Sequence, residues 1–312
     1  MPQIYGKEIS LTNGWIEIFG DWRMENEGNR IIHEGTKNGA TIDRVYINNV
    51  KASDGYLKTK INILSDTGGE KQAQLVFRYI DFQRYYFAGI GGWRKKFCIG
   101  KRVPEGWFGL VLLGEETEVN LGFEFDVKIT FVGTRIELFL GEVKIAEIND
   151  NLSPYLSGNV GLRTWKQNKV VFENVCLSQE KARSFVIMPF NEKYRALYEN
   201  FIKKLLNDAG LETKRADEIF GNRPIIQDIL ENIQKSRLIV AFVTEMNPNV
   251  LYEIGVAHTL NKDVIILTAD VNKLPFDIKH LRCIQYEDSL LGSEKLRKEF
   301  KETVDQVLSK GY

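Results

Sequence analysis

The segment LIVAFVTEMNPNVLYEIGVAH, residues Leu238–His258, carries the clearest fold signal in the chain. Apolar and β-branched residues fill Ile239–Val243, as expected of a strand that is buried in a parallel sheet. A polar turn, residues 245–249, leads into a helical pattern whose first turn is expected to carry Tyr252 and Glu253. Parallel sheets bind ligands just beyond the carboxyl ends of their strands. This junction is therefore the first candidate for a ligand site, and Glu253 is placed to act on the ligand.

The same alternation of strand and helix runs from residue 183 to the end of the chain. Strands are expected at Ser184–Met188, Leu211–Arg215, Ile239–Val243 and Val264–Leu267. Helices with an apolar stripe are expected at Glu192–Asn207, at Pro224–Gln234, after Asn249 and at Ser293–Ser309. Alternating strand and helix units predict a parallel sheet with helices on both faces.

Residues 1–180 follow a different pattern, in which short alternating segments are separated by polar or glycine-rich turns. Clear examples are Tyr56–Leu64, Gln74–Tyr79, Phe123–Phe131 and Arg135–Leu140. Many short strands with frequent turns predict an antiparallel β-sandwich. The chain is thus expected to have two domains, a sandwich in residues 1–180 and an α/β domain in residues 183–312, joined by a short charged junction.

Composition narrows the classes of function. The chain has 312 residues, and its 42 lysine and arginine residues balance 42 aspartate and glutamate residues, which gives no support for a nucleic-acid or acidic-membrane partner. Three scattered cysteines have no metal-ligand spacing and imply no disulfide framework. No signal sequence and no apolar run of about 18 residues is visible. A cytoplasmic protein without a metal or a bound cofactor is expected.

Three motifs of the second half, in this order, resemble one superfamily: Ser184–Phe190, Arg215–Glu218 and Asn247–His258. This superfamily contains the nucleoside 2-deoxyribosyltransferase-like domains and the bacterial TIR-like domains. The resemblance covers roughly residues 183–312 and implies a flavodoxin-like fold that cleaves or transfers the N-glycosidic bond of nucleosides or of NAD. Glu253 stands at the position of the family's catalytic glutamate. Many relatives have an aspartate where this chain has Thr244, so no nucleobase contact is carried over to that position.

The chemistry of this bond suits a carboxylate at position 253. Breaking an N-glycosidic bond builds positive charge on the ribosyl carbon, which a carboxylate stabilises or attacks. The turn amides and the helix N-terminus are expected to favour the ionised form of Glu253. The plainer alternative is that Glu253 only complements the dipole of its helix.

The remaining candidates for substrate contact stand at the strand ends: Pro189, Phe190, Arg215, Asp217, Asn249 and Tyr252. In this hypothesis Phe190 stacks on a base beside a phosphate, Asp217 holds a ribose hydroxyl, and Asn249 donates to a sugar or phosphate oxygen. Structural alternatives stay open for each kind of residue. Asn249 and Asp217 are also good capping residues, Arg215 also suits a solvated strand end, and Tyr252 also suits a core.

The first half resembles concanavalin A-like sandwiches of the laminin G and jelly-roll type through Gly158–Trp165 and Val170–Val175. Such domains often bind glycans, and some are glycoside hydrolases. The laminarinase-type pattern Glu-x-Asp-x-x-Glu is incomplete here, because Glu124 and Asp126 are followed by Ile129 instead of a second glutamate. Without a carboxylate pair, acid–base glycoside hydrolysis is not expected. The sandwich is interpreted as a binding or sensing module for a glycan or a protein. Its aromatic residues are assigned to the core by default, with a sugar platform made by a few of them as the alternative: Tyr79, Phe82, Tyr85, Tyr86, Phe87 and Trp93.

The resemblance of the second half implies a hydrolase of the N-glycosidic bond of NAD or a related nucleotide, with NAD as substrate and no other cofactor, whose activity depends on self-association. The resemblance also implies an effector of bacterial antiviral defence. The loop at residues 218–224 is expected to be a moving or interface element, because its glycine and its length permit rearrangement. Three alternatives stay open: a nucleoside 2-deoxyribosyltransferase in salvage, a non-catalytic TIR-like scaffold, and a lectin in which the second half is regulatory.

Overall fold

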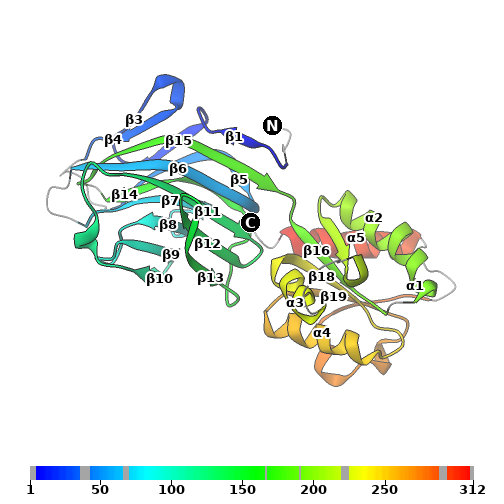
Figure 1. The fold of residues 1–312 in the computed structure, drawn as a ribbon. Helices are drawn as coiled ribbons and strands as arrows, with labels where there is room; N and C mark the ends of the chain where they lie inside the picture. The colour runs from blue at the N-terminus through cyan, green and yellow to red at the C-terminus, as the bar shows by residue number, and fades with distance from the viewer. Residues whose placement is uncertain are drawn as a thin grey trace. The chain divides into compact units, whose positions relative to one another are not determined.

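The computed structural model describes residues 5–35, 43–65, 70–165, 167–189, 191–218, 225–287 and 294–309. The chain divides into two compact units, with the boundary between Glu180 and Lys181 (Figure 1). Only Lys181 and Ala182 separate the last strand of the first unit from the first strand of the second.

The first unit is built from two antiparallel sheets. In the described residues, the first sheet has the order β13 (Val143–Asn149), β12 (Arg135–Leu140), β11 (Glu124–Val132), β6 (Asp54–Ser65), β15 (Lys169–Glu180), β4 (Arg30–His33) and β3 (Trp22–Glu25), with β1 (Glu8–Ser10) also paired to β15. The second sheet has the order β10 (Gly106–Leu113), β9 (Phe97–Val103), β8 (Arg84–Ile90), β7 (Ala73–Asp81), β14 (Gly158–Trp165), β5 (Asp43–Ala52) and β2 (Trp15–Phe19). The described part of this unit also has two short 3-10 turns, η1 (Asn26–Gly28) and η2 (Glu116–Glu118).

A two-residue period determines what each strand of the sandwich buries. On β6, Leu57 and Ile61 are completely buried in the core between the sheets, while Lys58 and Lys60 point outward. Those lysines form ion pairs on the outer face, Lys60 with Glu124 at 2.8 Å. Successive side chains of a strand lie on opposite faces, so the alternation seen in the sequence selects one face for the core. The prediction of an antiparallel sandwich is confirmed.

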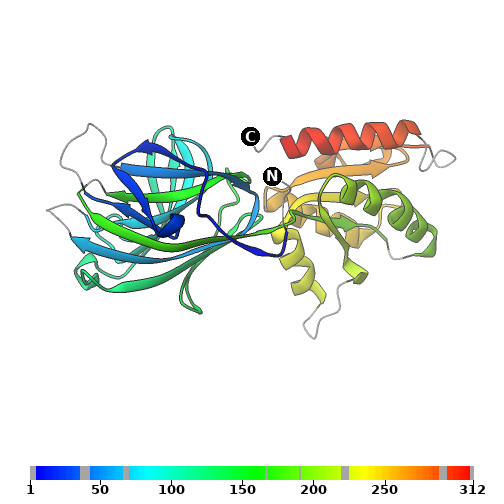
Figure 2. The ribbon, with the colours of Figure 1, turned by 90° about the horizontal axis from the view of Figure 1, so that it is seen from above.

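The second unit has a parallel sheet. Its described strands have the order β17 (Glu212–Arg215), β16 (Arg183–Ile187), β18 (Ser236–Phe242), β19 (Asp263–Thr268) and β20 (Arg282–Gln285), and every pairing is parallel. One face is covered by α1 (Glu192–Leu197), the π-turn η3 (Tyr198–Ile202), α2 (Lys203–Asp208) and α5 (Glu294–Ser309). The other face is covered by α3 (Ile225–Lys235) and α4 (Pro248–Thr259) (Figures 1 and 2). The 3-10 turns are η4 (Ala216–Glu218), η5 (Val271–Lys273) and η6 (Phe276–Ile278).

The strands and helices expected in this unit are present, and the predicted parallel sheet is confirmed. The helix after β16 ends as expected at Gly210, whose φ of 85° is left-handed, and the amide of Leu211 donates to the carbonyl of Leu206 at 3.1 Å. The strand β20 was not predicted, because it is a short edge strand whose sequence, RCIQ, has a single strongly apolar residue.

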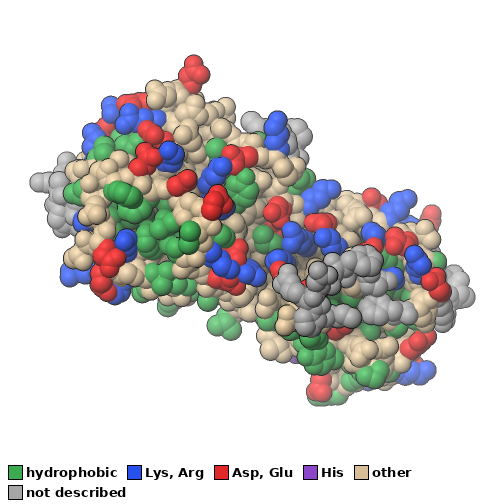
Figure 3. Space-filling view, viewed as in Figure 1, with side chains coloured by type: hydrophobic (Ala, Val, Ile, Leu, Met, Phe, Trp, Pro, Cys, Tyr) green, Lys and Arg blue, Asp and Glu red, His purple; other side chains and the backbone are tan. Residues whose placement is uncertain are grey.

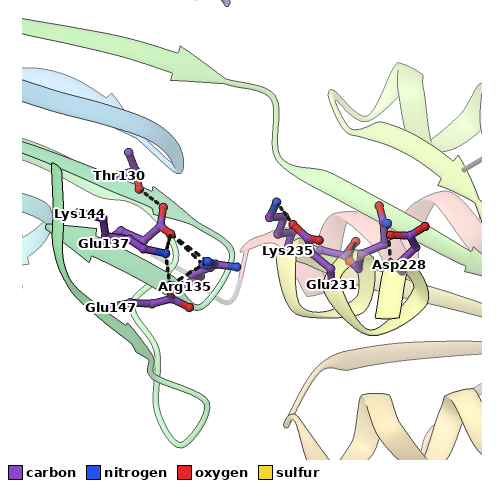
Figure 4. A network of polar contacts seen from close by, with 10 residues as sticks. Thr130, Arg135, Glu137, Lys144, Glu147, Asp228, Glu231 and Lys235 are labelled. Carbon is purple, nitrogen blue, oxygen red and sulfur yellow. Dashed lines mark hydrogen bonds and ion pairs between the residues drawn. The ribbon is translucent and has the colours of Figure 1, made fainter. Parts of the chain in front are cut away.

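Charged groups are spread over the surface as small networks. On the outer face of the first sheet, Glu137 accepts from Thr130 at 2.7 Å, and Arg135 and Lys144 bridge Glu137 to Glu147 (Figure 4). Figure 3 shows lysine and arginine side chains interspersed with acidic ones over both units. This mixed surface agrees with the neutral balance of the sequence.

Candidate functional site

Because the described strands in the sheet of the α/β unit are all parallel, their carboxyl ends meet at one edge, and the segments that follow them define the candidate site. These segments are Met188-Pro189 after β16, Ala216–Glu218 after β17, Val243–Met246 after β18, Ala269-Asp270 after β19 and Tyr286-Glu287 after β20. Ligands of such sheets bind at this edge.

Helix α4 begins two residues earlier than the capping alternative for Asn249 requires. The side chain of Asn247 is the N-cap and accepts from the amides of Asn249 at 2.9 Å and Val250 at 3.4 Å. Pro248 occupies the first helical position, which its fixed φ favours, and it holds the preceding residue extended, as a cap must be. The capping role suggested for Asn249 is therefore wrong, and so is the expected place of Glu253, which lies in the second turn of α4.

Glu253 has a buried and unpaired carboxyl group. Its side chain lies on the side of α4 that packs on the sheet with Val250, Ile254 and Ala257, and the residue is 9% exposed. Within the described ranges it makes no hydrogen bond and no ion pair. Burial raises the pKa of Glu253 from 4.5 to about 7.

The expectation that helix amides favour an ionised Glu253 is therefore wrong. The free amides of the first turn are capped by Asn247, and the dipole of a helix acts mainly within its first turn. Near neutral pH the carboxyl is divided between its two protonation states. A group of this kind suits acid–base or nucleophilic chemistry, because perturbed carboxyls concentrate at functional sites.

Arg215 lies at the end of β17, on the opposite face of the sheet from Glu253. It is 5% exposed, and its guanidinium carbon is 4.7 Å from the centre of the Tyr198 ring. Its Nη1 also lies 3.8 Å from Sδ of Met188. The alternative of a solvated strand-end charge is therefore wrong for Arg215.

Glu218, three residues further on, is the polar centre of this face. Its carboxylate accepts from the Tyr198 hydroxyl at 2.6 Å, from the Arg215 amide at 3.0 Å and from Lys203. Burial alone raises the pKa of Glu218, but the hydrogen bonds from Lys203 and Tyr198 outweigh it and hold that pKa below its ordinary value. Glu218 is thus an ionised anchor for the segment that follows β17.

Two further tyrosines reach the same edge. The Tyr194 hydroxyl donates to Glu245 at 2.6 Å, and the hydroxyls of Thr244 and Tyr286 lie 2.6 Å apart. The rings of Tyr194 and Tyr286 pack on Phe242 at centroid distances of 4.7 and 5.4 Å. The sequence reasoning missed these residues, although the spacing of Tyr194 and Tyr198 by one helical turn was a usable signal.

The other predicted contacts are scattered. Pro189 is buried, and its carbonyl accepts from the Asn191 amide at 3.1 Å. Asn249 is exposed, and Tyr252 is 58% exposed, so the alternative that Tyr252 belongs to the core is wrong. Phe190, the side chain of Asp217 and residues 219–224 lie outside the described part of the structure. The structure therefore places Arg215 and Glu253 near the same edge of the sheet but on its opposite faces.

The sandwich has a shallow pocket on the outer face of its first sheet, with an empty volume of about 290 Å³. Its charged lining residues are paired, Lys60 with Glu124 at 2.8 Å and Arg30 with Glu173 at 3.2 Å. Glu124 points outward, whereas Ile129 is completely buried in the core. Among its described lining residues, this pocket has no free carboxylate pair of the kind that glycoside hydrolysis requires.

No protein-family model matches the chain, and no curated protein matches it. Solved structures that are similar include the carbohydrate binding module CBM66 from Bacillus subtilis, at 20% identity and a TM-score of 0.46, over 57% of this chain and all of that one. The β-glucanase of Bacillus licheniformis has 10% identity and a TM-score of 0.40, over 56% of this chain and 98% of the other. A Bacillus subtilis protein of unknown function with a galectin-like fold has 12% identity and a TM-score of 0.41, over 56% and 95%.

Those similarities concern the β-sandwich unit. By its own architecture, the chain joins an antiparallel β-sandwich to a parallel α/β unit. None of the helices in the described ranges is long and apolar enough to cross a membrane.

Proposed function

We propose that the α/β unit hydrolyses the N-glycosidic bond of NAD or a related nucleotide, with Glu253 as the catalytic carboxyl group. One observation carries the proposal. The carboxyl of Glu253 is buried without a partner among the described residues, on the helix that follows the central strand β18, and its pKa is about 7. A structural carboxylate in this position would normally have a hydrogen-bond donor.

The order of the strands supports a ligand at this edge. Counted along the unit, the order β17-β16-β18-β19-β20 is 2-1-3-4-5, the order of flavodoxin-like sheets. Their ligands bind where the first and third strands diverge, which here lies between the ends of β16 and β18. Helix α4 directly follows β18, and Glu253 lies in its second turn.

The proposed reaction uses the ionised form of Glu253. The bond between the ribosyl carbon and the nicotinamide nitrogen breaks, and its electron pair neutralises the pyridinium ring. Water adds to the ribosyl carbon and releases a proton, so the products are nicotinamide and ADP-ribose. The positive charge of bound substrate lowers the pKa of a nearby carboxyl, so binding would shift Glu253 toward the charged form that stabilises the ribosyl cation.

The test is the release of nicotinamide from NAD by the purified full chain, followed over a series of protein concentrations. Glu253→Gln should lower the rate by at least about a hundredfold, as expected for the loss of a catalytic or charge-stabilising group. Glu302→Gln, on the exposed side of α5, is the matched control and should keep the full rate. Equal turnover by Glu253→Gln and the unchanged protein, or no turnover at any concentration, overturns the proposal.

Three further parts of the proposal rest on the family resemblance alone. These are activation by self-association, a role in antiviral defence, and a sandwich that recognises a glycan or protein signal. Base exchange between deoxynucleosides, assayed with the same variants, distinguishes a deoxyribosyltransferase from an NAD hydrolase. A protein that catalyses neither reaction would be a scaffold.

A further inference from the structure

The second sheet of the sandwich carries a buried and unpaired arginine on its outer face, the side that is turned away from the first sheet. Arg102, on β9, is 8% exposed, and in the described residues it forms no ion pair. Its Nη1 donates to the Val103 carbonyl at 2.8 Å, while its Nε has no hydrogen-bond partner. Burying a cation without an anion is costly, so such a group is expected to have an anionic partner.

A second unsatisfied polar group lies beside Arg102. The strand register places Tyr85 on β8 opposite Arg102, and Arg102 opposite Trp107 on β10. Tyr85 is completely buried, and its hydroxyl has no hydrogen bond of normal geometry, although the Trp107 indole approaches it. The guanidinium carbon of Arg102 lies 4.0 Å from the centre of the Trp107 ring. The three side chains therefore form one row on one face, here called the Arg102 row.

A second arginine adds to the positive charge of this face. Arg163, on β14, is 5% exposed. It forms an ion pair with Asp43 and with no other described residue. It donates to Gln72 at 3.1 Å and to Gln74, while its Nε has no partner. Of these two arginines, only Arg163 has a carboxylate partner among the described residues, that of Asp43, so the positive charge of Arg102 is not balanced.

Aromatic rings flank these donors. The Phe87 ring lies 4.4 Å from the Arg163 guanidinium and stacks on Trp93 at 6.0 Å and 15°. Trp93 is held by left-handed backbone, with a φ of 51°, and strain of this kind persists where the surroundings enforce it. Trp107 is 44% exposed and covers Arg102. This face thus combines unsatisfied donors with accessible aromatic rings.

We propose that the Arg102 row binds a carboxylate-bearing saccharide. The carboxylate pairs with Arg102 and accepts from the Tyr85 hydroxyl, and the Trp107 ring turns outward to stack on the sugar ring. An anion satisfies the unbalanced charge, while a saccharide, unlike a polyglutamate peptide, also supplies the apolar C–H face of its ring for Trp107 and hydroxyl groups for the remaining donors. The proposal deepens the recognition role proposed above for the sandwich, and it does not depend on Glu253.

The first experiment compares three ligands on the full chain by titration calorimetry. The probes are a galacturonate oligomer, a neutral galactose oligomer of matched length, and a short polyglutamate peptide. Binding of the galacturonate oligomer alone is the expected result. Equal binding of the neutral oligomer would show that the carboxylate is not recognised. Equal binding of the peptide would show that the ligand need not be a saccharide. If no probe binds, the proposal of a binding site is overturned.

The second experiment separates a binding role from a structural one. Arg102→Met and Tyr85→Phe should each weaken galacturonate binding at least about tenfold, the usual effect of losing a hydrogen bond to a charged group. Both should keep or raise the thermal midpoint of the sandwich, because each removes a buried unsatisfied group. Arg84→Gln, which removes an exposed arginine at the start of β8 that pairs with Asp81 at the end of β7, should bind normally. Wild-type affinity in Arg102→Met, or a lower midpoint together with the lost binding, overturns the proposal.

Discussion

The hydroxyl of Tyr198 donates to the carboxylate of Glu218 at 2.6 Å and thereby joins the helix after β16 to the end of β17. Tyr198 is completely buried, and Glu218 also binds the backbone amide of Arg215. The bond raises the pKa of Tyr198, after the larger effect of burial, and lowers that of Glu218. One carboxylate thus fixes the direction in which the chain leaves the second strand of the sheet.

Replacing Tyr198 with phenylalanine should lower the free energy of unfolding of the α/β unit by about 1–2 kcal/mol, because Glu218 loses a hydrogen bond to a charged acceptor. Urea unfolding followed by circular dichroism measures the change in the transition of that unit. Tyr252→Phe removes the hydroxyl of an exposed tyrosine and should leave the transition unchanged. A Tyr198→Phe protein as stable as the unchanged one would show that this bond contributes nothing net.

The raised pKa of Glu253 predicts that stability depends on pH. The folded state binds this proton more tightly than the unfolded chain, because its pKa is about 7 in the folded state and 4.5 ordinarily. The contribution of Glu253 is therefore most favourable below pH 4.5, falls as the pH rises, and is lost above about pH 7. Glu253→Gln should be more stable than the unchanged protein at pH 8, by at most about 3 kcal/mol, and similar to it at pH 4.5. Urea midpoints measured at both pH values test this, and an equal difference at the two would contradict it.

The same group sets the pH profile of the proposed reaction. If ionised Glu253 acts on NAD, kcat/KM should rise with pH and level off above the pKa of the free protein, about 7. Nicotinamide release measured from pH 5 to pH 9 gives the profile. A rate that falls over this range would mean that the protonated carboxyl is the active form, and the role of Glu253 would change from charge stabiliser to proton donor.

Strong apolar runs made much of the α/β unit predictable. The segment Ile239–Val243 is buried on both faces of the sheet, so its β-branched run could hardly be anything but a central strand. Edge strand β20 is exposed in part and has no such run. The N-cap of α4 was ambiguous because asparagines stand on both sides of Pro248, and only the geometry of proline at the first helical position selects Asn247.

Long-range pairing explains what the sequence could not predict about the candidate site. Tyr198 and Glu218 are 20 residues apart and meet only because β16 and β17 are neighbours. Arg102 gave no signal either, because Lys101 and Arg102 look like a solvated pair of charges. Strand alternation instead buries them on opposite faces of one sheet, Lys101 against Asp150 at 2.7 Å and Arg102 under Trp107.

The network of Arg135, Glu137, Lys144 and Glu147 on the first sheet should contribute little to stability (Figure 4). Side chains of this network are 18–41% exposed, and ion pairs in contact with water give about 0–1 kcal/mol. Lys144→Ala should therefore change the free energy of unfolding of the sandwich by less than about 1 kcal/mol, and added salt should reduce the change further. Urea unfolding at low and at high salt measures both effects. A larger loss would mean that the network acts cooperatively.

Arg78 should be the opposite case. It is completely buried, forms an ion pair with Asp54 at 3.1 Å and donates to the carbonyls of Ser53, Gly133 and Tyr155 at 2.8–2.9 Å. Arg78→Met leaves Asp54 as a buried charge without its cation, so the sandwich should lose about 3–5 kcal/mol of stability. Arg78→Lys should recover only part of this, because a single ammonium group cannot reach all of these acceptors in the plane of a guanidinium. Thermal unfolding of both variants tests the order, and a lysine variant as stable as the unchanged protein would show that charge alone, without the fork geometry, stabilises this part of the sandwich.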